Sequence, residues 1–339
     1  MTSEILLEYL SQRFPEWSKI AIHNFQDITS GWETEIFAFD VTYTHSEKSE
    51  EHAWILRIYP GTPGPDKARD EYKTYQILQS AEYPVPQVIL IETDTRWLGK
   101  PFIIMDRIIG HTAEFHLLQS RDREDSLRII REMCTLNLKL HNTDWSKVPG
   151  IPEEYYKVTP KDMFLQSIER FRNWLYDKKV EYLLPLVNWL QSNHDKISFD
   201  RCSIIHRDFH AANVLVDIEG NYFVIDWTAA RLGDYRSDLA RSMLLARIYF
   251  DNEYWQLILK GYESAAGETV EDIDYFLVEA AIHMFAYFLL SLKDGTESLG
   301  MREETVETMQ SSLHLLTKLH DLVEQITGIR IKAIDTQIN

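Results

Sequence analysis

The residues best suited to chemistry lie in one segment, IIHRDFHAANVLVDIEGNYFVIDW, at positions 204–227. This segment places HRDFHAAN between two apolar runs. A plain core strand would not carry that many ionisable groups, because burying them without partners is very costly. The segment therefore predicts either a surface loop or a chemical site.

The apolar runs that follow the loop predict a β-hairpin. Their connection is DIEGN, in which Gly220 and Asn221 are suited to positive φ. The turn is centred between Glu219 and Gly220, and Asn213 and Asp226 are equidistant from that point. Residues equidistant from a hairpin turn are cross-strand neighbours. We therefore predict that Asn213 and Asp226 lie side by side at the open end.

The chemistry expected there is phosphoryl transfer. Asp208 precedes Asn213 by five positions and is expected to face the same point. Carboxylate and amide oxygens suit a hard cation such as Mg²⁺. In phosphoryl transfer one aspartate takes or orients the acceptor hydroxyl, while other oxygen ligands hold Mg²⁺ on the nucleotide phosphates. We predict Asp208 as the catalytic group and Asn213 and Asp226 as metal ligands.

HRDFHAAN also resembles the H-x-D-x-x-x-x-N catalytic loop of the kinase superfamily. With its second histidine, His210, the motif reads H-x-D-x-H-x-x-N, which resembles the aminoglycoside phosphotransferase and choline kinase branch of that superfamily. VIDWTAARLGDYRSDLA resembles that branch too, where a tryptophan follows the metal aspartate and a G-D-x-x-x-D-L-A segment comes next. The resemblance implies an O-phosphotransferase that uses Mg²⁺ and takes its phosphoryl group from ATP (or GTP).

The same resemblance implies phosphate-binding parts nearer the N-terminus. Glu71 stands where the family's helix carries a glutamate that pairs with a basic residue on the third strand, and Arg57 is the candidate partner. A guanidinium can pair a carboxylate and phosphate oxygens in fork geometry; a plain surface ion pair is the alternative. Backbone amides of Ser30 and Gly31 are expected to reach phosphate, although TSGWETE has a single glycine where protein kinases have three.

The adenine base is expected to lie against the hinge from Met105 to Ile108, which includes Arg107, with backbone groups making the hydrogen bonds. Four further residues are expected to support the catalytic loop without touching substrate: His206, His210, Asp234 and Asp238. Of these, Asp238 is expected to be a buried anchor and Asp234 the N-cap of the next helix.

Hydrophobic periodicity places this site in a two-part protein. Residues 1–110 alternate apolar and polar side chains and include one helical stretch, whereas helical spacing dominates from about residue 111 onward. Together with the resemblance, this predicts an α+β, bilobal, protein-kinase-like fold. Residues 1–110 would be a small β-rich nucleotide-binding lobe, and residues 111–339 a larger, mainly helical lobe that carries the catalytic loop and acceptor-binding helices.

Composition limits the partners. The formal net charge of −18 argues against a general nucleic-acid binder. It favours a small, cationic, hydroxyl-bearing acceptor, although an acidic surface can serve solubility alone. Cys134 and Cys202 provide no disulfide framework, which favours a cytoplasmic location. FLVEAAIHMFAYFLLSL is interrupted by Glu279 and His283 and predicts a core helix, so no membrane partner is expected.

Two other functions compete with the phosphotransferase. One is an idle nucleotide-binding scaffold of the same fold, which is disfavoured because every chemical position is retained. The other is a metallohydrolase with His206, Asp208 and His210 as zinc or iron ligands. The H-x-D-x-H spacing on an extended segment would place all three on one side. That hypothesis leaves Asn213 and Asp226 unexplained.

Overall fold

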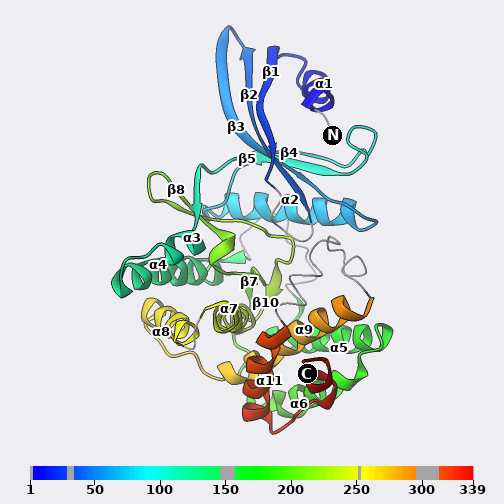
Figure 1. Ribbon diagram of the computed structural model, residues 1–339, viewed down its shortest axis with the longest axis vertical. Helices are drawn as coiled ribbons and strands as arrows, with labels where there is room; N and C mark the ends of the chain where they lie inside the picture. Colours follow the sequence, from blue (N-terminus) through cyan, green and yellow to red (C-terminus); the bar gives the residue numbers. More distant parts are fainter. Residues whose placement is uncertain (1–2, 29–33, 146–156, 251–252, 295–312, 339) are drawn as a thin grey trace. The chain divides into compact units, whose positions relative to one another are not determined.

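The computed structural model describes residues 3–28, 34–145, 157–250, 253–294 and 313–338 (Figure 1). These residues form two compact units. The first comprises the described residues up to Gly110 together with Asp217–Thr228, and the second contains the other described residues from His111 onward. The segment Asp217–Thr228 thus groups with the first unit, although in sequence it lies within the region expected to form the helical lobe. The first unit is built on a sheet and the second is mainly helical, so the α+β prediction is confirmed.

The first unit contains a five-stranded antiparallel sheet with the order β1-β2-β3-β5-β4. Two helices pack on it. The elements are α1 (Ser3–Arg13), β1 (Ser18–Asp27), β2 (Glu35–His45), β3 (Lys48–Ile58), α2 (Gly64–Ser80), β4 (Val88–Glu92) and β5 (Phe102–Asp106).

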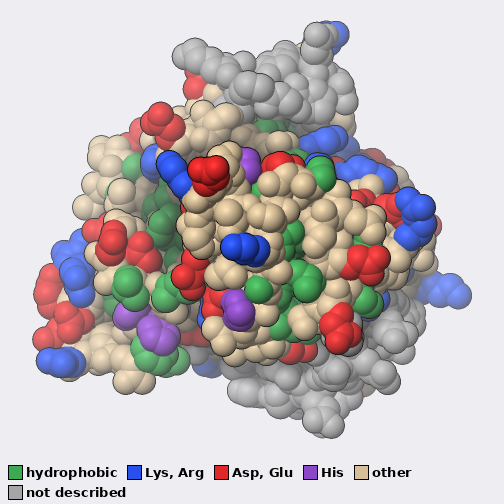
Figure 2. Space-filling view, turned by 90° about the horizontal axis from the view of Figure 1, so that it is seen from above, with side chains coloured by type: hydrophobic (Ala, Val, Ile, Leu, Met, Phe, Trp, Pro, Cys, Tyr) green, Lys and Arg blue, Asp and Glu red, His purple; other side chains and the backbone are tan. Residues whose placement is uncertain are grey.

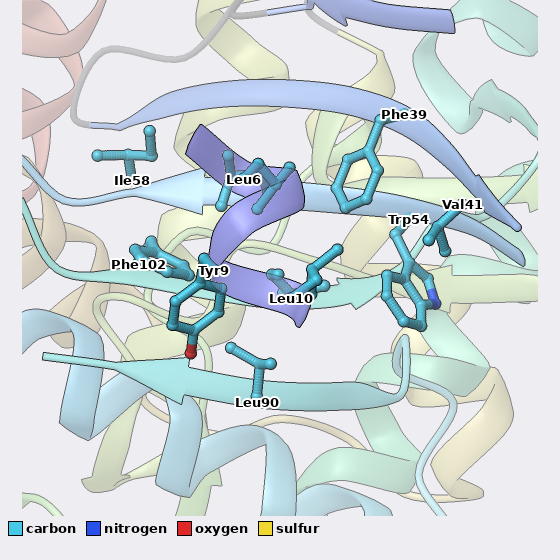
Figure 3. Close-up of a cluster of buried hydrophobic side chains, with 11 residues drawn as sticks. Leu6, Tyr9, Leu10, Phe39, Val41, Trp54, Ile58, Leu90 and Phe102 are labelled. Carbon is cyan, nitrogen blue, oxygen red and sulfur yellow. The ribbon is translucent and has the colours of Figure 1, made fainter. Parts of the chain in front are cut away.

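Alternation along β3 gives the sheet two different faces. Leu56 and Ile58 point into a cluster with Leu10 of α1, which Figure 3 shows lying over the strands. Arg57, between them in sequence, points the other way, as successive side chains of a strand must. Its guanidinium contacts Glu71 of α2. Helix α1 therefore covers the apolar face of the sheet, and α2 covers the face that carries the buried arginine.

The turn predicted at DIEGN is present between β8 (Val214–Asp217) and β9 (Tyr222–Val224). The Asp217 carboxylate accepts hydrogen bonds from the backbone N–H groups of Glu219 and Asn221, both at 2.8 Å. Gly220 has φ of 88°, as expected, whereas Asn221 does not adopt positive φ. Asn221 stabilises the turn instead through its side chain, which donates to Asp217.

The second unit is a set of packed helices with a short antiparallel pair, β7 and β10. Helix α7 packs against α8 and α9. The elements are β6 (Gly110–Thr112), α3 (Ala113–Leu118), α4 (Arg123–His141), α5 (Pro160–Asp177), α6 (Leu184–Asn193), β7 (Ser203–Ile205), β10 (Arg231–Gly233), α7 (Tyr235–Tyr249), α8 (Tyr254–Ala266), α9 (Ile273–Asp294), α11 (Leu313–Thr327) and α12 (Lys332–Ile338).

Helix α9 is a core helix with two buried ionisable side chains. Within the described ranges, its stretch Ile273–Leu290 is the one segment long and apolar enough to cross a membrane, but 83% of it is buried inside the protein. Glu279 and His283 interrupt its apolar surface, and Glu279 Oε1 lies 3.2 Å from His283 Nε2. Burial lowers the pKa of His283 to about 4. The imidazole is therefore neutral in the folded protein near pH 7.

This burial predicts a pH-dependent stability. The pKa of His283 is lower in the folded protein than in the unfolded chain, so its contribution is present above about pH 6.5 and is lost as the pH falls toward 4. We expect His283→Gln to remove roughly 2 kcal/mol of the decrease in unfolding free energy between pH 7.5 and 4.5. Urea unfolding at several pH values measures this. Exposed His111→Gln is the control; equal pH slopes in both variants would contradict the assignment.

Candidate active site

One buried carboxylate holds the backbone of the predicted catalytic loop, residues 206–213. Asp238, fully buried on α7, accepts hydrogen bonds from the backbone N–H groups of His206 at 2.9 Å and Arg207 at 2.6 Å. Its Oδ2 also lies 3.1 Å from His141 Nε2 on α4. Burial acts to raise the pKa of Asp238, but the hydrogen bond and charge of His141 outweigh it, and the pKa lies below its usual value. The anchor is an ionised carboxylate that holds Arg207 at φ of 70°.

His206 is part of the same support. Its side chain is fully buried, and its Nδ1 accepts a hydrogen bond from the backbone N–H of Asp208 at 3.2 Å. At the start of α7, the Asp234 carboxylate accepts from the backbone N–H of Arg236 at 2.9 Å and therefore caps the helix. His206 and Asp234 each bind a backbone N–H group, as residues that support the loop and the helix would.

Three side chains converge on Asp208. His210 Nε2 lies 3.3 Å from Asp208 Oδ2, and Arg241 Nη2 lies 3.5 Å from Oδ1. Asn213 Nδ2 donates to the backbone oxygen of Asp208 at 3.0 Å and to Oδ2 at 3.2 Å. His210, expected only as structural support, thus contacts the predicted catalytic group directly.

The hydrogen bonds also orient the two neighbours of Asp208. His210 Nδ1 accepts from the backbone N–H of Ala212 at 3.3 Å, which leaves Nε2 to donate toward Asp208 Oδ2. Both N–H groups of the Asn213 amide are turned toward Asp208. The amide oxygen of Asn213 is consequently the atom available for a cation.

The electrostatics keep Asp208 ionised. Burial acts to raise its pKa, but the hydrogen bond from His210 and the nearby charge of Arg241 outweigh burial. The pKa of Asp208 therefore lies well below its usual range. Such a carboxylate is a strong hydrogen-bond acceptor for an alcohol but a weak base toward it in the ground state.

A second cluster, in the first unit, contains the other predicted polar residues. Arg57 Nη2 lies 2.6 Å from Asp226 Oδ1, and Arg57 Nε lies 3.3 Å from Glu71 Oε2. Glu71 also accepts from the hydroxyl of Tyr59 at 2.5 Å and from the backbone N–H of Trp227 at 3.2 Å. One buried guanidinium therefore joins the sheet, helix α2 and the segment that carries Asp226.

Arg57 remains positively charged in this cluster. Burial opposes that charge, but Asp226 and Glu71 outweigh burial and hold the pKa of Arg57 well above its usual value. Burial, together with repulsion from Asp226, raises the pKa of Glu71, while Arg57 opposes the shift. The Asp226 side chain is 35% exposed, so its carboxylate keeps contact with solvent. An exposed carboxylate beside a fixed guanidinium suits a metal–phosphate group.

The remaining nucleotide-binding predictions concern a loop and a hinge. Ser30 and Gly31 lie outside the described residues. Met105 is buried in β5, and the backbone N–H of Arg107 is bound to the Ala53 carbonyl oxygen at 2.9 Å. For the part of the chain that is described, the next residue, Ile108, makes no backbone–backbone hydrogen bond. Within the predicted hinge, Ile108 is the residue whose backbone groups suit an adenine edge.

The side chains of the two predicted metal ligands suit Mg²⁺ better than zinc or iron. The Asn213 amide and the Asp226 carboxylate provide oxygen, the ligand atom that Mg²⁺ prefers. Among the described residues, no group of three His, Cys, Asp or Glu side chains is arranged to hold a metal ion. His206 is turned to the backbone of Asp208, which argues against the His206, Asp208 and His210 metallohydrolase.

Sequence reasoning missed Arg241, which contacts the Asp208 carboxylate. A signal was present, because Arg241 follows the anchor Asp238 by three positions on α7. Residues three apart lie on the same face of a helix. An arginine there is therefore directed toward the loop that Asp238 holds.

Comparisons with known proteins agree with this geometry. The sequence matches the family described as "Phosphotransferase enzyme family" over residues 25–276. No curated protein matches the sequence. The structure is similar to a Ralstonia eutropha protein described as an aminoglycoside phosphotransferase, with a TM-score of 0.64, 18% identity, and coverage of 96% of this chain and 97% of that one.

Two other solved structures share the fold. One is a thermostable mutant of aminoglycoside phosphotransferase APH(4)-Ia in a ternary complex with AMP-PNP and hygromycin B, with a TM-score of 0.59, 17% identity and 98% coverage of both chains. The other is macrolide 2'-phosphotransferase MphH from Brachybacterium faecium, with a TM-score of 0.57, 14% identity, and coverage of 91% of this chain and 97% of that one. The predicted resemblance is thus confirmed, and the chain belongs to the phosphotransferase enzyme family as a small-molecule kinase.

Proposed function

We propose that the protein is an Mg²⁺-dependent O-phosphotransferase that moves a phosphoryl group from ATP (or GTP) to a hydroxyl of a small molecule. The observation that carries this proposal is the ionised Asp208 carboxylate, held by His210, Arg241 and Asn213. Two solved structures with a similar fold support a nucleotide donor and a small-molecule acceptor. One contains AMP-PNP with hygromycin B, and the other contains ADP with spectinomycin.

Asp208 would act mainly by positioning. Its carboxylate accepts a hydrogen bond from the acceptor hydroxyl and points one oxygen lone pair of that alcohol at the phosphorus. Phosphoryl transfer passes through a loose transition state, so the hydroxyl needs little deprotonation beforehand. A carboxylate of low pKa is sufficient for this task, because the alcohol becomes acidic only as the new P–O bond forms. The proton then passes to Asp208.

The other predicted residues would bind the donor. Asn213 and Asp226 would hold Mg²⁺, which when bound neutralises charge on the phosphates. Arg57, oriented by Glu71, presents a guanidinium to phosphate oxygens. We assign contacts with phosphate to the backbone amides of Ser30 and Gly31. Contacts with adenine we assign to the hinge that includes Met105 and Arg107, through the backbone of Ile108.

We place the reaction in the cytoplasm, because Cys134 and Cys202 are both free thiols. A reducing compartment keeps such thiols free. A cytoplasmic enzyme would also have direct access to ATP and Mg²⁺.

The first test removes the charge of Asp208. We expect Asp208→Asn to lower kcat by roughly 10²–10⁴-fold, the usual contribution of a positioned acid–base group. The measurement is acceptor-dependent ADP release with Mg-ATP, screened over amino-alcohols, aminoglycosides, macrolides and sugars. Thermal unfolding and Mg-ADP binding of the variant serve as controls for folding. Undiminished turnover in Asp208→Asn would refute the assigned role.

The second test concerns the phosphate clamp. Arg57→Lys keeps the positive charge but loses the fork that reaches Glu71 and Asp226 together. We expect KM for ATP to rise roughly tenfold or more, because a hydrogen bond to a charged group contributes about 1.5–3 kcal/mol. Initial rates over a range of ATP concentrations measure this.

The matched control for the clamp is Arg69→Lys. Arg69 lies on α2 like Glu71, but it is exposed and pairs only with neighbouring Asp66 in the described chain. Its substitution should leave KM for ATP unchanged. A similar rise in both variants would assign the effect to helix α2 in general and not to the clamp.

A further inference from the structure

A group of arginines lies beside the catalytic loop. Arg207 immediately precedes Asp208, and Arg231 lies on β10, which pairs with β7 so that Arg231 is opposite Ile205. Arg170 follows Ser167 by three positions on α5 and so lies on the same face of that helix, and Arg231 Nη2 lies 3.2 Å from Ser167 Oγ. We call Arg170, Arg207 and Arg231 the arginine cluster. Its members come from the loop, β10 and α5, all within the second unit.

The arginine cluster has an excess of positive charge. Its carboxylate neighbour is Glu279, whose Oε1 lies 3.5 Å from Arg207 Nη1. Glu279 is buried and ionised: burial acts to raise its pKa, but the hydrogen bond with His283 and the nearby positive charges lower the pKa to about 2. His283 is neutral near pH 7. Three guanidinium groups and one carboxylate leave a net charge of +2.

Arg231 has no carboxylate within ion-pair distance among the described residues. Its Nη2 donates to the neutral hydroxyl of Ser167 on α5 at 3.2 Å. Arg231 is exposed, so an anion from solution can reach its guanidinium. Among the described residues this guanidinium has a neutral hydrogen-bond partner but no counter-ion. The folded protein would gain stability if an anion occupied this place.

An aromatic surface lies between the same two helices, α5 and α9. The rings of Trp174 on α5 and Tyr287 on α9 have centroids 5.7 Å apart, and Tyr287 is 39% exposed. Arg170 lies four positions before Trp174 on α5, so the two side chains are neighbours on the helix surface. A half-exposed aromatic pair next to cationic groups suits a ring or sugar that carries an acidic substituent.

We propose that the arginine cluster binds an anionic group, a carboxylate or a phosphate ester, carried by the phosphoryl acceptor. The acceptor would then be an acidic alcohol, whose hydroxyl reaches Asp208 while its anion contacts Arg231 and Arg170. This inference rests on the proposed phosphotransferase function, because it names the substrate class of that site.

The proposal reverses the expectation drawn from net charge. The net charge of −18 belongs to the whole chain, and Figure 2 shows acidic and basic side chains interspersed over one face of the protein. Exposed charges farther apart than about 8–10 Å are largely screened by salt. The charge that an acceptor meets is therefore the local one, and at the arginine cluster it is positive.

The first experiment measures anion binding without catalysis. Thermal unfolding of the full chain is followed in sodium phosphate, sodium glucuronate and sodium chloride at equal ionic strength. We expect phosphate or glucuronate to raise the Tm of the wild type by about 2–4 °C over chloride when the anion is near tenfold its Kd. Arg231→Gln and Arg170→Gln should lose at least half of this rise.

Arg128→Gln is the matched control, because Arg128 is an exposed arginine of α4 and its loss changes the net charge equally. It should keep the wild-type rise. Anions bound at a nucleotide-phosphate site stabilise all four proteins alike, so the difference among variants isolates the cluster. An equal rise in wild type, Arg231→Gln and Arg170→Gln would overturn the proposal. Phosphate and glucuronate, compared separately, distinguish a phosphate-binding from a carboxylate-binding cluster.

The second experiment compares acceptors that share one scaffold but differ in charge: glucuronate, glucose and glucosamine. With Mg-ATP, we expect kcat/KM to decrease in that order, and Arg231→Gln to reduce the preference for glucuronate over glucosamine at least tenfold. A preference for glucosamine that Arg231→Gln leaves unchanged would overturn the acceptor assignment. Failure of the phosphotransferase itself is distinguishable, because Mg-ADP binding would be absent while Arg231-dependent anion binding persists.

Discussion

The buried carboxylate of Asp238 is the interaction on which the catalytic loop depends. An ionised group in the core is tolerated only where hydrogen bonds and opposite charge replace water. Asp238 meets this condition with two backbone N–H groups and His141, which joins α4, α7 and the loop. The loop is thereby fixed at Arg207 and His206, and the direction of Asp208 follows from those two residues. The ionisation of Asp238 therefore also determines the position of the predicted catalytic group.

Much of the site could be predicted because local rules decide it. Strand alternation directs Arg57 away from the apolar face of the sheet. The motif spacing of five positions brings Asp208 and Asn213 together within one loop. Helix capping by Asp234 likewise needs only the neighbouring backbone. Each of these depends on a few adjacent residues, whose geometry the chain itself restricts.

Other parts depend on packing between distant elements, which residue types alone do not reveal. The contact of Arg57 with Asp226 joins positions far apart in the sequence, and the contact of Arg207 with Glu279 requires α9 to lie beside the loop. The net charge is also silent on local charge, since it averages over the whole surface. The charge beside the loop depends on which helices the fold brings together, and α5 carries Arg170 on the same face as Ser167, which accepts a hydrogen bond from Arg231.

Asp226 combines backbone strain with a carboxylate that we propose as a metal ligand. Its φ of 67° lies in the left-handed region, which costs a non-glycine residue about 1 kcal/mol or more. Glycine would adopt that conformation without strain. Glycine would relieve this strain but would lose the carboxylate that pairs with Arg57 at 2.6 Å and that we propose as a ligand of Mg²⁺. Drift toward glycine at position 226 would mark a descendant that had kept the fold and abandoned the reaction.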